Sequence, residues 1–141
     1  MSISNWEINK DWTLFLDRDG VINERIFGGY VTSPEEFTFS EGTLEAIRAF
    51  SKIFNRIIVV TNQQGIAKGI MTERNLLNLH DYMVNSINDN GGRIDAIYFA
   101  SNLKGAEGDI RKPKPDMGLL AKKDFTEIDF SKSIMVGDTD S

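Results

Sequence analysis

The sequence predicts a doubly wound α/β domain, in which helices cover both faces of a parallel β-sheet. Four short apolar segments recur along the 141 residues, and three of them are rich in Ile, Val or Phe with little alternation. Such segments suit parallel strands that are buried on both faces. Helical patterns lie between them, and the order β-α-β-α-β-α-β implies right-handed crossovers between parallel strands.

The four apolar segments are the expected strands, and each is followed by polar or charged residues. They cover Thr13–Leu16, Arg56–Val60, Ile94–Ala100 and Ser133–Val136. Each is far shorter than the ~20 apolar residues that a membrane-spanning helix needs. The sequence therefore predicts four strands and no membrane span.

Three helices are expected between the strands. The first covers residues 43–54, where apolar side chains recur at three- and four-residue steps. The second covers residues 72–88, with Thr72 as its N-cap. The third begins near Pro115, a residue that suits the first helical position, and ends near Asp124.

Composition bounds the domain count and the class of protein. A length of 141 residues predicts one domain that covers residues 1–141. The absence of cysteine excludes disulfides, thiolate zinc sites and cysteine nucleophiles. A net charge of −5 argues against binding to nucleic acid or acidic membranes, because both need a basic face. The N-terminus lacks the apolar run of a secretory signal, so a cytoplasmic location is expected.

Polar and charged side chains collect where the strands end. In doubly wound sheets, ligands bind beyond the carboxyl ends of the strands, so these segments predict the place of an active site. The single histidine, His80, lies in the second expected helix, far from these ends, and is interpreted as structural. The four segments are Asp17-Arg18-Asp19-Gly20-Val21, Thr61-Asn62-Gln63-Gln64-Gly65, Arg111-Lys112-Pro113-Lys114-Pro115 and Gly137-Asp138-Thr139-Asp140.

Asp17 and Asp19 carry the first candidate chemistry. Their spacing along an extended backbone puts both side chains on the same side, with Arg18 pointing away. Two adjacent carboxylates can divide labour, one as nucleophile or metal ligand and the other as acid and base. A solvated turn is the alternative interpretation. The position after an apolar strand and before Gly20 favours the functional one.

Three further side chains add to the candidate site. The Thr61 hydroxyl could donate to a phosphoryl oxygen, although a lone threonine more often just ends a strand. Arg111 and Lys112 supply clustered positive charge that suits a phosphate, whereas a basic pair in a loop is usually solvated surface. Asp138 is a third carboxylate at a strand end, and three converging carboxylates imply Mg²⁺.

With these segments in order after their strands, the chain resembles a haloacid dehalogenase superfamily phosphatase. The resemblance covers almost the whole chain and implies a Rossmann-type sheet with a minimal cap. Thr61-Asn62-Gln63 and Arg111-Lys112-Pro113 are similar to the small-capped histidinol-phosphate and heptose-bisphosphate phosphatases. Gly29-Tyr30-Val31, followed by Pro34-Glu35-Glu36-Phe37, resembles the heptose-bisphosphate group more closely.

The resemblance implies a role for each matching residue. Asp17 would attack phosphorus, and Asp19 would protonate the leaving oxygen and then activate water. Thr61 and Lys112 would hold the phosphoryl oxygens. Mg²⁺ would be bound by the Asp17 carboxylate, the Asp19 backbone carbonyl and the Asp138 carboxylate. The implied substrate contacts are Gly29, Tyr30, Asn62, Gln63, Gln64 and Arg111.

The implied activity is Mg²⁺-dependent hydrolysis of a phosphate monoester through an aspartyl phosphate. Within the group, the resemblance implies removal of the 7-phosphate of D-glycero-D-manno-heptose 1,7-bisphosphate, a precursor in lipopolysaccharide core synthesis. The alternatives are histidinol phosphate, another small metabolite or a nucleic-acid 3′-phosphate, and the acidic pI of about 4.9 opposes the last. The expected partner is a phosphorylated small molecule, with no nucleic acid and no membrane.

Two features depart from the family pattern. Many relatives carry a zinc loop before the third motif, and its Cys and His positions fall here near Ala100, Asn102, Gly108 and Ile110. None of these can be a thiolate or imidazole ligand, so no zinc is expected. The usual second carboxylate of the fourth motif would fall one position beyond Ser141, which predicts a chain truncated at its C-terminus.

Two alternatives come from other classes of protein. A response-regulator receiver domain shares the doubly wound fold, but it needs a phosphoacceptor Asp where the third strand ends. That strand ends here in Tyr98-Phe99-Ala100-Ser101-Asn102. A catalytically dead scaffold is the other alternative, supported only by the shortened C-terminus. Magnesium-dependent release of phosphate from p-nitrophenyl phosphate would separate an enzyme from a scaffold.

Overall fold

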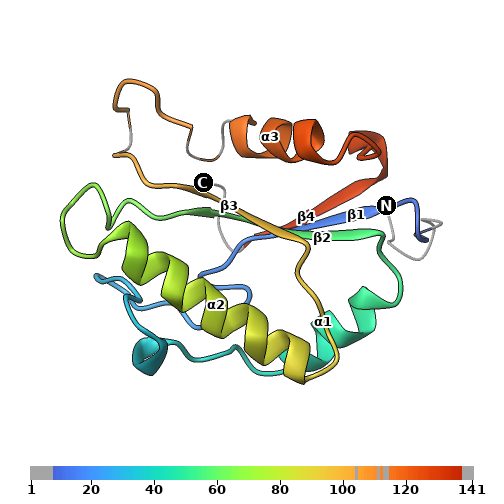
Figure 1. Ribbon diagram of the computed structural model, residues 1–141, viewed down its shortest axis with the longest axis horizontal. Helices are drawn as coiled ribbons and strands as arrows, with labels where there is room; N and C mark the ends of the chain where they lie inside the picture. Colours follow the sequence, from blue (N-terminus) through green and yellow to red (C-terminus); the bar gives the residue numbers. More distant parts are fainter. Residues whose placement is uncertain (1–7, 104, 111, 113–114, 138–141) are drawn as a thin grey trace.

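The computed structural model describes residues 8–103, 105–110, 112 and 115–137. In these residues, four parallel strands form one sheet with helices on both faces, as the sequence predicts (Figure 1). The strands are β1 (Thr13–Leu16), β2 (Arg56–Asn62), β3 (Ala96–Ala100) and β4 (Ser133–Val136). The helices are α1 (Thr43–Ser51), α2 (Glu73–Asp89) and α3 (Asp116–Asp124), with short 3-10 turns at Pro34–Glu36 and Phe130–Lys132.

The strand order β3-β2-β1-β4 places β1 in the interior of the sheet. Leu14 of β1 lies opposite Ile57 of β2 and Ile134 of β4. Because β1 leads directly into Asp17 and β2 contains Thr61, the first two polar strand ends are neighbours. The predicted central position of the first strand is therefore confirmed.

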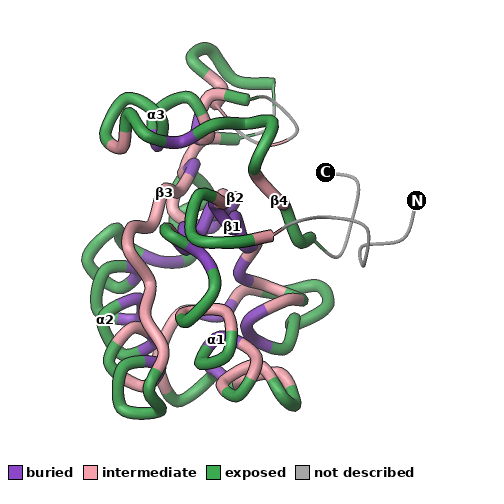
Figure 2. The backbone as a smooth tube through the Cα atoms, turned by 90° about the vertical axis from the view of Figure 1, so that its right-hand side faces the viewer, coloured by how far each residue is buried: buried purple, intermediate pink, exposed green. Residues whose placement is uncertain are grey.

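Side-chain alternation along the strands divides the core into two clusters, one on each face of the sheet. On the face covered by α1 and α2, Leu14 packs with Leu79. On the face covered by α3, Phe15 packs with Met117. The strands β1 and β2 are buried over nearly their whole length (Figure 2). Burial on both faces explains their unbroken apolar sequences.

Several element boundaries differ from the expected ones by one to three residues, among them the end of β2 at Asn62, and local hydrogen bonds accompany the differences at α1 and β3. Helix α1 ends at Ser51, whose hydroxyl donates to a carbonyl one turn earlier, and Phe54 packs into the core from outside the helix. Strand β3 begins at Ala96 rather than two residues earlier. There, the Asp95 carboxylate accepts from the Ile57 backbone N–H at 2.7 Å, so a side chain takes the place of a backbone acceptor between β2 and β3.

The starts of the later helices follow from capping. The predicted N-cap of α2 is confirmed, because Thr72 Oγ1 accepts from the Asn75 N–H at 3.0 Å and Asn75 Oδ1 accepts in return from the Thr72 N–H at 2.9 Å. Helix α3 begins at Asp116, and Pro115 stands at its N-cap rather than at the first helical position. None of the described helices combines the length and apolar character needed to cross a membrane.

The close packing around Gly92 predicts a penalty for a larger side chain. A Cβ atom at Gly92 would lie 3.0 Å from Ile47 Cγ2 and 3.0 Å from Ile87 Cγ2, both in the core. We expect Gly92→Ala to lower the free energy of unfolding by about 1–3 kcal/mol in urea denaturation, because a packed core resists added volume.

Gly118→Ala in α3 is the matched control. A Cβ atom there would lie 3.8 Å from the Phe130 ring, an ordinary contact. Helix propensity should then raise the free energy of unfolding by about 0.5–1 kcal/mol. Equal stability changes in the two variants would contradict the packing described around Gly92.

Candidate active site

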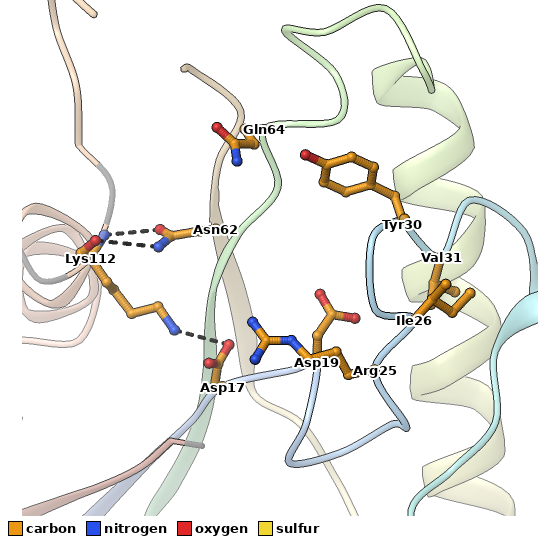
Figure 3. Close-up of a pocket in the computed structure, with 10 residues that line it drawn as sticks. Asp17, Asp19, Arg25, Ile26, Tyr30, Val31, Asn62, Gln64 and Lys112 are labelled. Carbon is orange, nitrogen blue, oxygen red and sulfur yellow. Dashed lines mark hydrogen bonds and ion pairs between the residues drawn. The ribbon is translucent and has the colours of Figure 1, made fainter. Parts of the chain in front are cut away.

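A cavity of about 150 Å³ lies beyond the carboxyl ends of β1 and β2, where the sequence predicts the site (Figure 3). Thr61 and Gln63 are buried and do not form part of its wall. Arg111 and Asp138 lie outside the described residues. The predicted residues found on the wall are Asp17, Asp19, Gly29, Tyr30, Asn62, Gln64 and Lys112.

A tight turn after β1 sets the direction of both aspartates. The Arg18 carbonyl accepts from the backbone N–H groups of Val21, Ile22 and Asn23. Gly20 has a φ of 85°, in the left-handed region that glycine adopts without strain. Its N–H donates to the Asn23 carbonyl at 2.8 Å. The glycine after the two carboxylates is therefore required by the backbone of the turn.

Asp17 forms an ion pair with Lys112. Lys112 Nζ lies 2.9 Å from Asp17 Oδ1, and the two side chains are only 14% and 13% exposed. The Arg18 backbone N–H donates to the same oxygen at 2.8 Å. Burial raises the pKa of Asp17, and the Lys112 charge and these hydrogen bonds oppose that rise without cancelling it. The setting of Asp17 therefore favours a further cation beside its carboxylate.

Asn62 holds the backbone of Lys112 in place. Its Oδ1 accepts from the Lys112 N–H at 2.9 Å, and its Nδ2 donates to the Lys112 carbonyl at 3.3 Å (Figure 3). The amide thus serves both backbone groups of one residue. The sequence predicts a substrate contact for Asn62, and the structure adds the task of placing the cation beside Asp17.

Asp19 accepts four hydrogen bonds from three buried side chains. Arg18 Nη2 and Nε donate to its Oδ1 at 2.8 and 3.2 Å, and Asn23 Nδ2 donates to the same oxygen at 2.9 Å. Gln63 Nε2 donates to Oδ2 at 2.9 Å. Burial alone would raise the pKa of Asp19, but the Arg18 charge and these hydrogen bonds lower it below its usual value. The pKa values of the two aspartates therefore shift in opposite directions.

The structure corrects the expected direction of Arg18 and adds a role for Gln63. Alternation predicts that Arg18 points away from the carboxylates, but its guanidinium is fully buried and turns back onto Asp19. Gln63 is 2% exposed and also donates to Thr61 Oγ1 at 2.9 Å, and the substrate contact that the resemblance implies for it stays a prediction. Gln63 therefore positions Asp19 and Thr61. Alternation gives the direction in which a side chain leaves the backbone, and a long side chain can still fold back.

His80 is close to the site, contrary to expectation. Its Nε2 lies 3.1 Å from Arg18 Nη1, and its ring packs against the Phe99 ring with centroids 6.4 Å apart. Burial, together with the Arg18 charge, lowers the pKa of His80 to about 3. The neutral ring can accept a hydrogen bond from Arg18, whereas a protonated imidazole has no lone pair to offer. His80 is structural, but it supports the partner of Asp19.

Part of the cavity wall comes from residues that sequence reasoning missed. Arg25, Ile26 and Val31 join the predicted residues there. They belong to an irregular loop, where neither helical nor strand periodicity gives a signal. The available signal for this part of the wall was Arg25, a basic residue close to Tyr30 in the sequence. A second cation also lies near that tyrosine, since Lys68 Nζ is 5.4 Å from the Tyr30 ring centroid.

Side-chain hydrogen bonds close the loop that follows β3. Asn102 Nδ2 donates to Asp109 Oδ1 at 2.6 Å, and the Gly105 N–H donates to Asp109 Oδ2 at 2.9 Å. Asn102 is one of the positions where the family pattern places a zinc ligand. An amide and a carboxylate therefore bridge the loop here, and the expected absence of zinc stays a prediction.

Comparisons with known sequences show which proteins this chain resembles. The family model described as polynucleotide kinase 3 phosphatase matches residues 13–141. A Vibrio cholerae protein named D-glycero-beta-D-manno-heptose-1,7-bisphosphate 7-phosphatase is 41% identical over 132 residues, which cover 89% of this chain and 69% of that protein. A Campylobacter jejuni protein named as the 7-phosphatase of the alpha anomer is 42% identical over 129 residues, which cover 92% and 72%.

Comparisons with solved structures also find phosphatases. The D,D-heptose 1,7-bisphosphate phosphatase from B. bronchiseptica, crystallised with magnesium and phosphate, superposes with a TM-score of 0.81 at 30% identity. The match covers 91% of this chain and 70% of that one. A putative HAD-like phosphatase from Mesorhizobium loti superposes with a TM-score of 0.73 at 30% identity, over 91% and 63% of the two chains.

The neutral ring of His80 predicts how stability depends on pH. The pKa of the ring is 6.5 in its ordinary state and about 3 in the fold, so between these values the unfolded state binds the extra proton. Stability should be full above about pH 7 and should fall as the pH drops, by up to about 1.4 kcal/mol per pH unit from this group.

Urea denaturation between about pH 4.5 and 7 measures this dependence. His80→Gln keeps a hydrogen-bond acceptor but cannot titrate, so its stability should fall less steeply than that of the wild type. The difference between the two slopes removes the contributions of Asp17 and Asp19, which also titrate differently in the fold. Identical slopes would contradict the buried neutral ring.

Proposed function

Because the chain belongs to the polynucleotide kinase 3 phosphatase family, we propose that it hydrolyses a phosphate monoester through a covalent aspartyl phosphate. One observation carries the proposal: Asp17 and Asp19 share a cavity wall, and Lys112 Nζ lies 2.9 Å from Asp17. Such a site combines an anionic nucleophile, an acid–base group and a cation for the phosphoryl group.

Asp17 acts as the nucleophile. One of its oxygens attacks phosphorus, the bond from phosphorus to the leaving alcohol breaks, and Asp19 gives its proton to the leaving oxygen. A phosphate dianion beside Asp19 raises its pKa and so favours the proton that this step needs. Water then attacks the aspartyl phosphate while Asp19 takes a proton, which releases phosphate and restores Asp17. The Arg18 charge favours the carboxylate form of Asp19 in this second half.

Lys112 offsets the repulsion between the nucleophile and the phosphate. Two anions cannot approach each other without a compensating charge, and the same charge stabilises the transition state. Lys112 already pairs with Asp17, so its ammonium group lies where a phosphoryl oxygen would arrive. Thr61 Oγ1 accepts from Gln63, which leaves the hydroxyl proton of Thr61 for a second phosphoryl oxygen.

The donor set fits a magnesium ion. Asp17 and Asp19 offer the hard oxygen ligands that Mg²⁺ prefers, and both carboxylates stand on the wall of the cavity. The proposed ligands are the Asp17 carboxylate, the Asp19 backbone carbonyl and the Asp138 carboxylate. Within the described residues, no group of three or more His, Asp or Glu side chains is placed to hold a metal, so the proposed site depends on Asp138. When bound, Mg²⁺ would neutralise charge on the phosphoryl group.

The proposed substrate is D-glycero-D-manno-heptose 1,7-bisphosphate, which would lose its 7-phosphate. Relatives at about 40% identity carry this name, for both anomers. The cavity suits a second phosphate, because Arg25 lies on its wall in addition to Lys112. Gly29, Tyr30 and Gln64 on the same wall are the proposed contacts to the sugar.

A polynucleotide 3′-phosphate is the main alternative, because the family description names it. The net charge of −5 opposes it, since binding to a polyanion depends on a basic face. Histidinol phosphate is the second alternative. It carries one phosphate, so it would not use Arg25 as the partner of a second phosphate.

A hydrolysis panel tests the proposed function. The purified chain with Mg²⁺ is offered both heptose bisphosphate anomers, histidinol phosphate, p-nitrophenyl phosphate and a 3′-phosphorylated oligonucleotide, and phosphate release is measured. We expect the highest kcat/KM for a heptose bisphosphate and no activity after chelation of Mg²⁺. Preference for the oligonucleotide would replace the proposed substrate, and no release from any compound would overturn the phosphatase proposal.

Asp17→Asn tests the nucleophile. An amide has nearly the same shape but is not a nucleophile, so kcat for p-nitrophenyl phosphate should fall on the order of a thousandfold or more under saturating Mg²⁺. Circular dichroism should show that the fold persists. Asp11→Asn, at an exposed carboxylate before β1, is the control and should retain full activity. Near-normal turnover by Asp17→Asn would rule out the covalent mechanism.

Arg25→Ala tests the second phosphate. A charge-assisted contact is worth about 1.5–3 kcal/mol, so kcat/KM for the bisphosphate should fall about ten- to a hundredfold. The loss should be much smaller for p-nitrophenyl phosphate, which has no second phosphate. Arg111→Ala, at another implied substrate contact, is the parallel variant. If neither variant distinguishes the two substrates, the bisphosphate loses its physical support.

A further inference from the structure

We propose that His80 is a positioning residue for Asp19, and that it acts by holding the guanidinium of Arg18 as a neutral hydrogen-bond acceptor. The inference rests on the proposed function, because it matters only if Asp19 transfers protons. It adds to that function a residue of α2 that does not line the reaction cavity.

The contacts of Arg18 define what the guanidinium requires. The side chain is fully buried. Nη2 and Nε donate to Asp19 Oδ1, and Nη1 meets His80 Nε2 at 3.1 Å. His80 therefore takes the guanidinium nitrogen that Asp19 does not take. A buried N–H group needs an acceptor, so without His80 the guanidinium would turn toward another one.

Such a turn would move Asp19, because Arg18 and Asp19 share two hydrogen bonds through one planar group. The planar fork transmits a rotation at Nη1 directly to Nε and Nη2. Asn23 and Gln63 would still hold Asp19, so the expected defect is a misplaced acid–base group and not a collapsed site. A misplaced proton donor lowers kcat more than it raises KM.

His80 also borders a second cavity. It has a volume of about 290 Å³, lies between α2 and β3, and includes His80 on its wall together with Leu77, Val84, Ile97 and Phe99. It shares no wall residue with the reaction cavity. A small aromatic molecule could therefore reach the place of the His80 ring without passing through the site of the reaction.

Three substitutions at His80 separate hydrogen bonding from packing. His80→Leu fills the space but offers no acceptor, so kcat should fall about ten- to a hundredfold, as expected for a lost hydrogen bond to a charged group. KM should change less than about threefold. His80→Gln offers a carbonyl oxygen and should recover most of the lost kcat. Asp81→Asn changes the neighbouring exposed side chain and should leave kcat unaffected.

Chemical rescue gives the sharpest test. His80→Ala leaves a hole that opens toward the second cavity, and added imidazole should raise its kcat because the imidazole has an acceptor nitrogen. Pyrrole has nearly the same shape but only an N–H donor, so it should not raise kcat. Neither compound should stimulate the wild-type chain. The thermal midpoint of each variant is measured under the same conditions to show that the chain is folded.

The outcomes separate this inference from the proposed function. An active wild type, with His80→Leu as active as His80→Gln, would overturn the role of His80 alone. Equal rescue by imidazole and pyrrole would show that the ring only fills space, and it would overturn the role too. An inactive wild type would overturn the proposed function and this inference together. Loss of kcat in His80→Leu with recovery in His80→Gln and by imidazole would support it.

Discussion

The buried guanidinium of Arg18 is the constraint on which the rest of the site depends. A cation without access to water is tolerated only when its charge and its N–H groups find partners, and removal of one partner typically costs roughly 3–5 kcal/mol. Asp19 supplies the charge and His80 supplies a neutral acceptor. This requirement ties the turn after β1 to helix α2, which lies on one face of the sheet (Figure 1). It also fixes the direction of Asp19, whereas Asp17 is held by Lys112 (Figure 3).

The two aspartates are chemically distinct although they stand two residues apart. Asp17 is partly buried beside one lysine, and its desolvation outweighs the lysine charge, so the pKa of its carboxyl is raised. Asp19 is half-buried beside an arginine and two amides, and these partners outweigh its desolvation, so the pKa of its carboxyl is lowered. Identical side chains thus receive different properties from their neighbours. This difference is a physical basis for the division of labour proposed for the two carboxylates. Lys112 beside Asp17 and the hydrogen-bond donors around Asp19 maintain the difference between the two carboxylates.

Much of the fold follows from local rules, and much of the site does not. Apolar segments that end in polar residues predict all four strands, and the Thr72 cap is readable because its partner Asn75 lies three residues away. The cavity wall contains most of the predicted polar residues, because parallel strands place their carboxyl ends together. The roles of Arg18 and His80 could not be predicted in this way. They depend on one contact across 62 positions and on the path of a long side chain. The place of Arg25 on the cavity wall could not be predicted either, because it lies in an irregular loop without helical or strand periodicity.

The two hydrogen bonds between Asn62 and the backbone of Lys112 have a consequence for how the site assembles during folding. The two residues are 50 positions apart, and the whole of α2 and β3 lies between them. Closing so long a segment carries an entropic penalty that local helix formation does not. We therefore expect Lys112 to join Asp17, the proposed nucleophile, only after β2, α2 and β3 have assembled. The ability to bind a phosphoryl group is in this sense a late product of folding. A nascent chain would display Asp17 to solvent before Lys112 could pair with it.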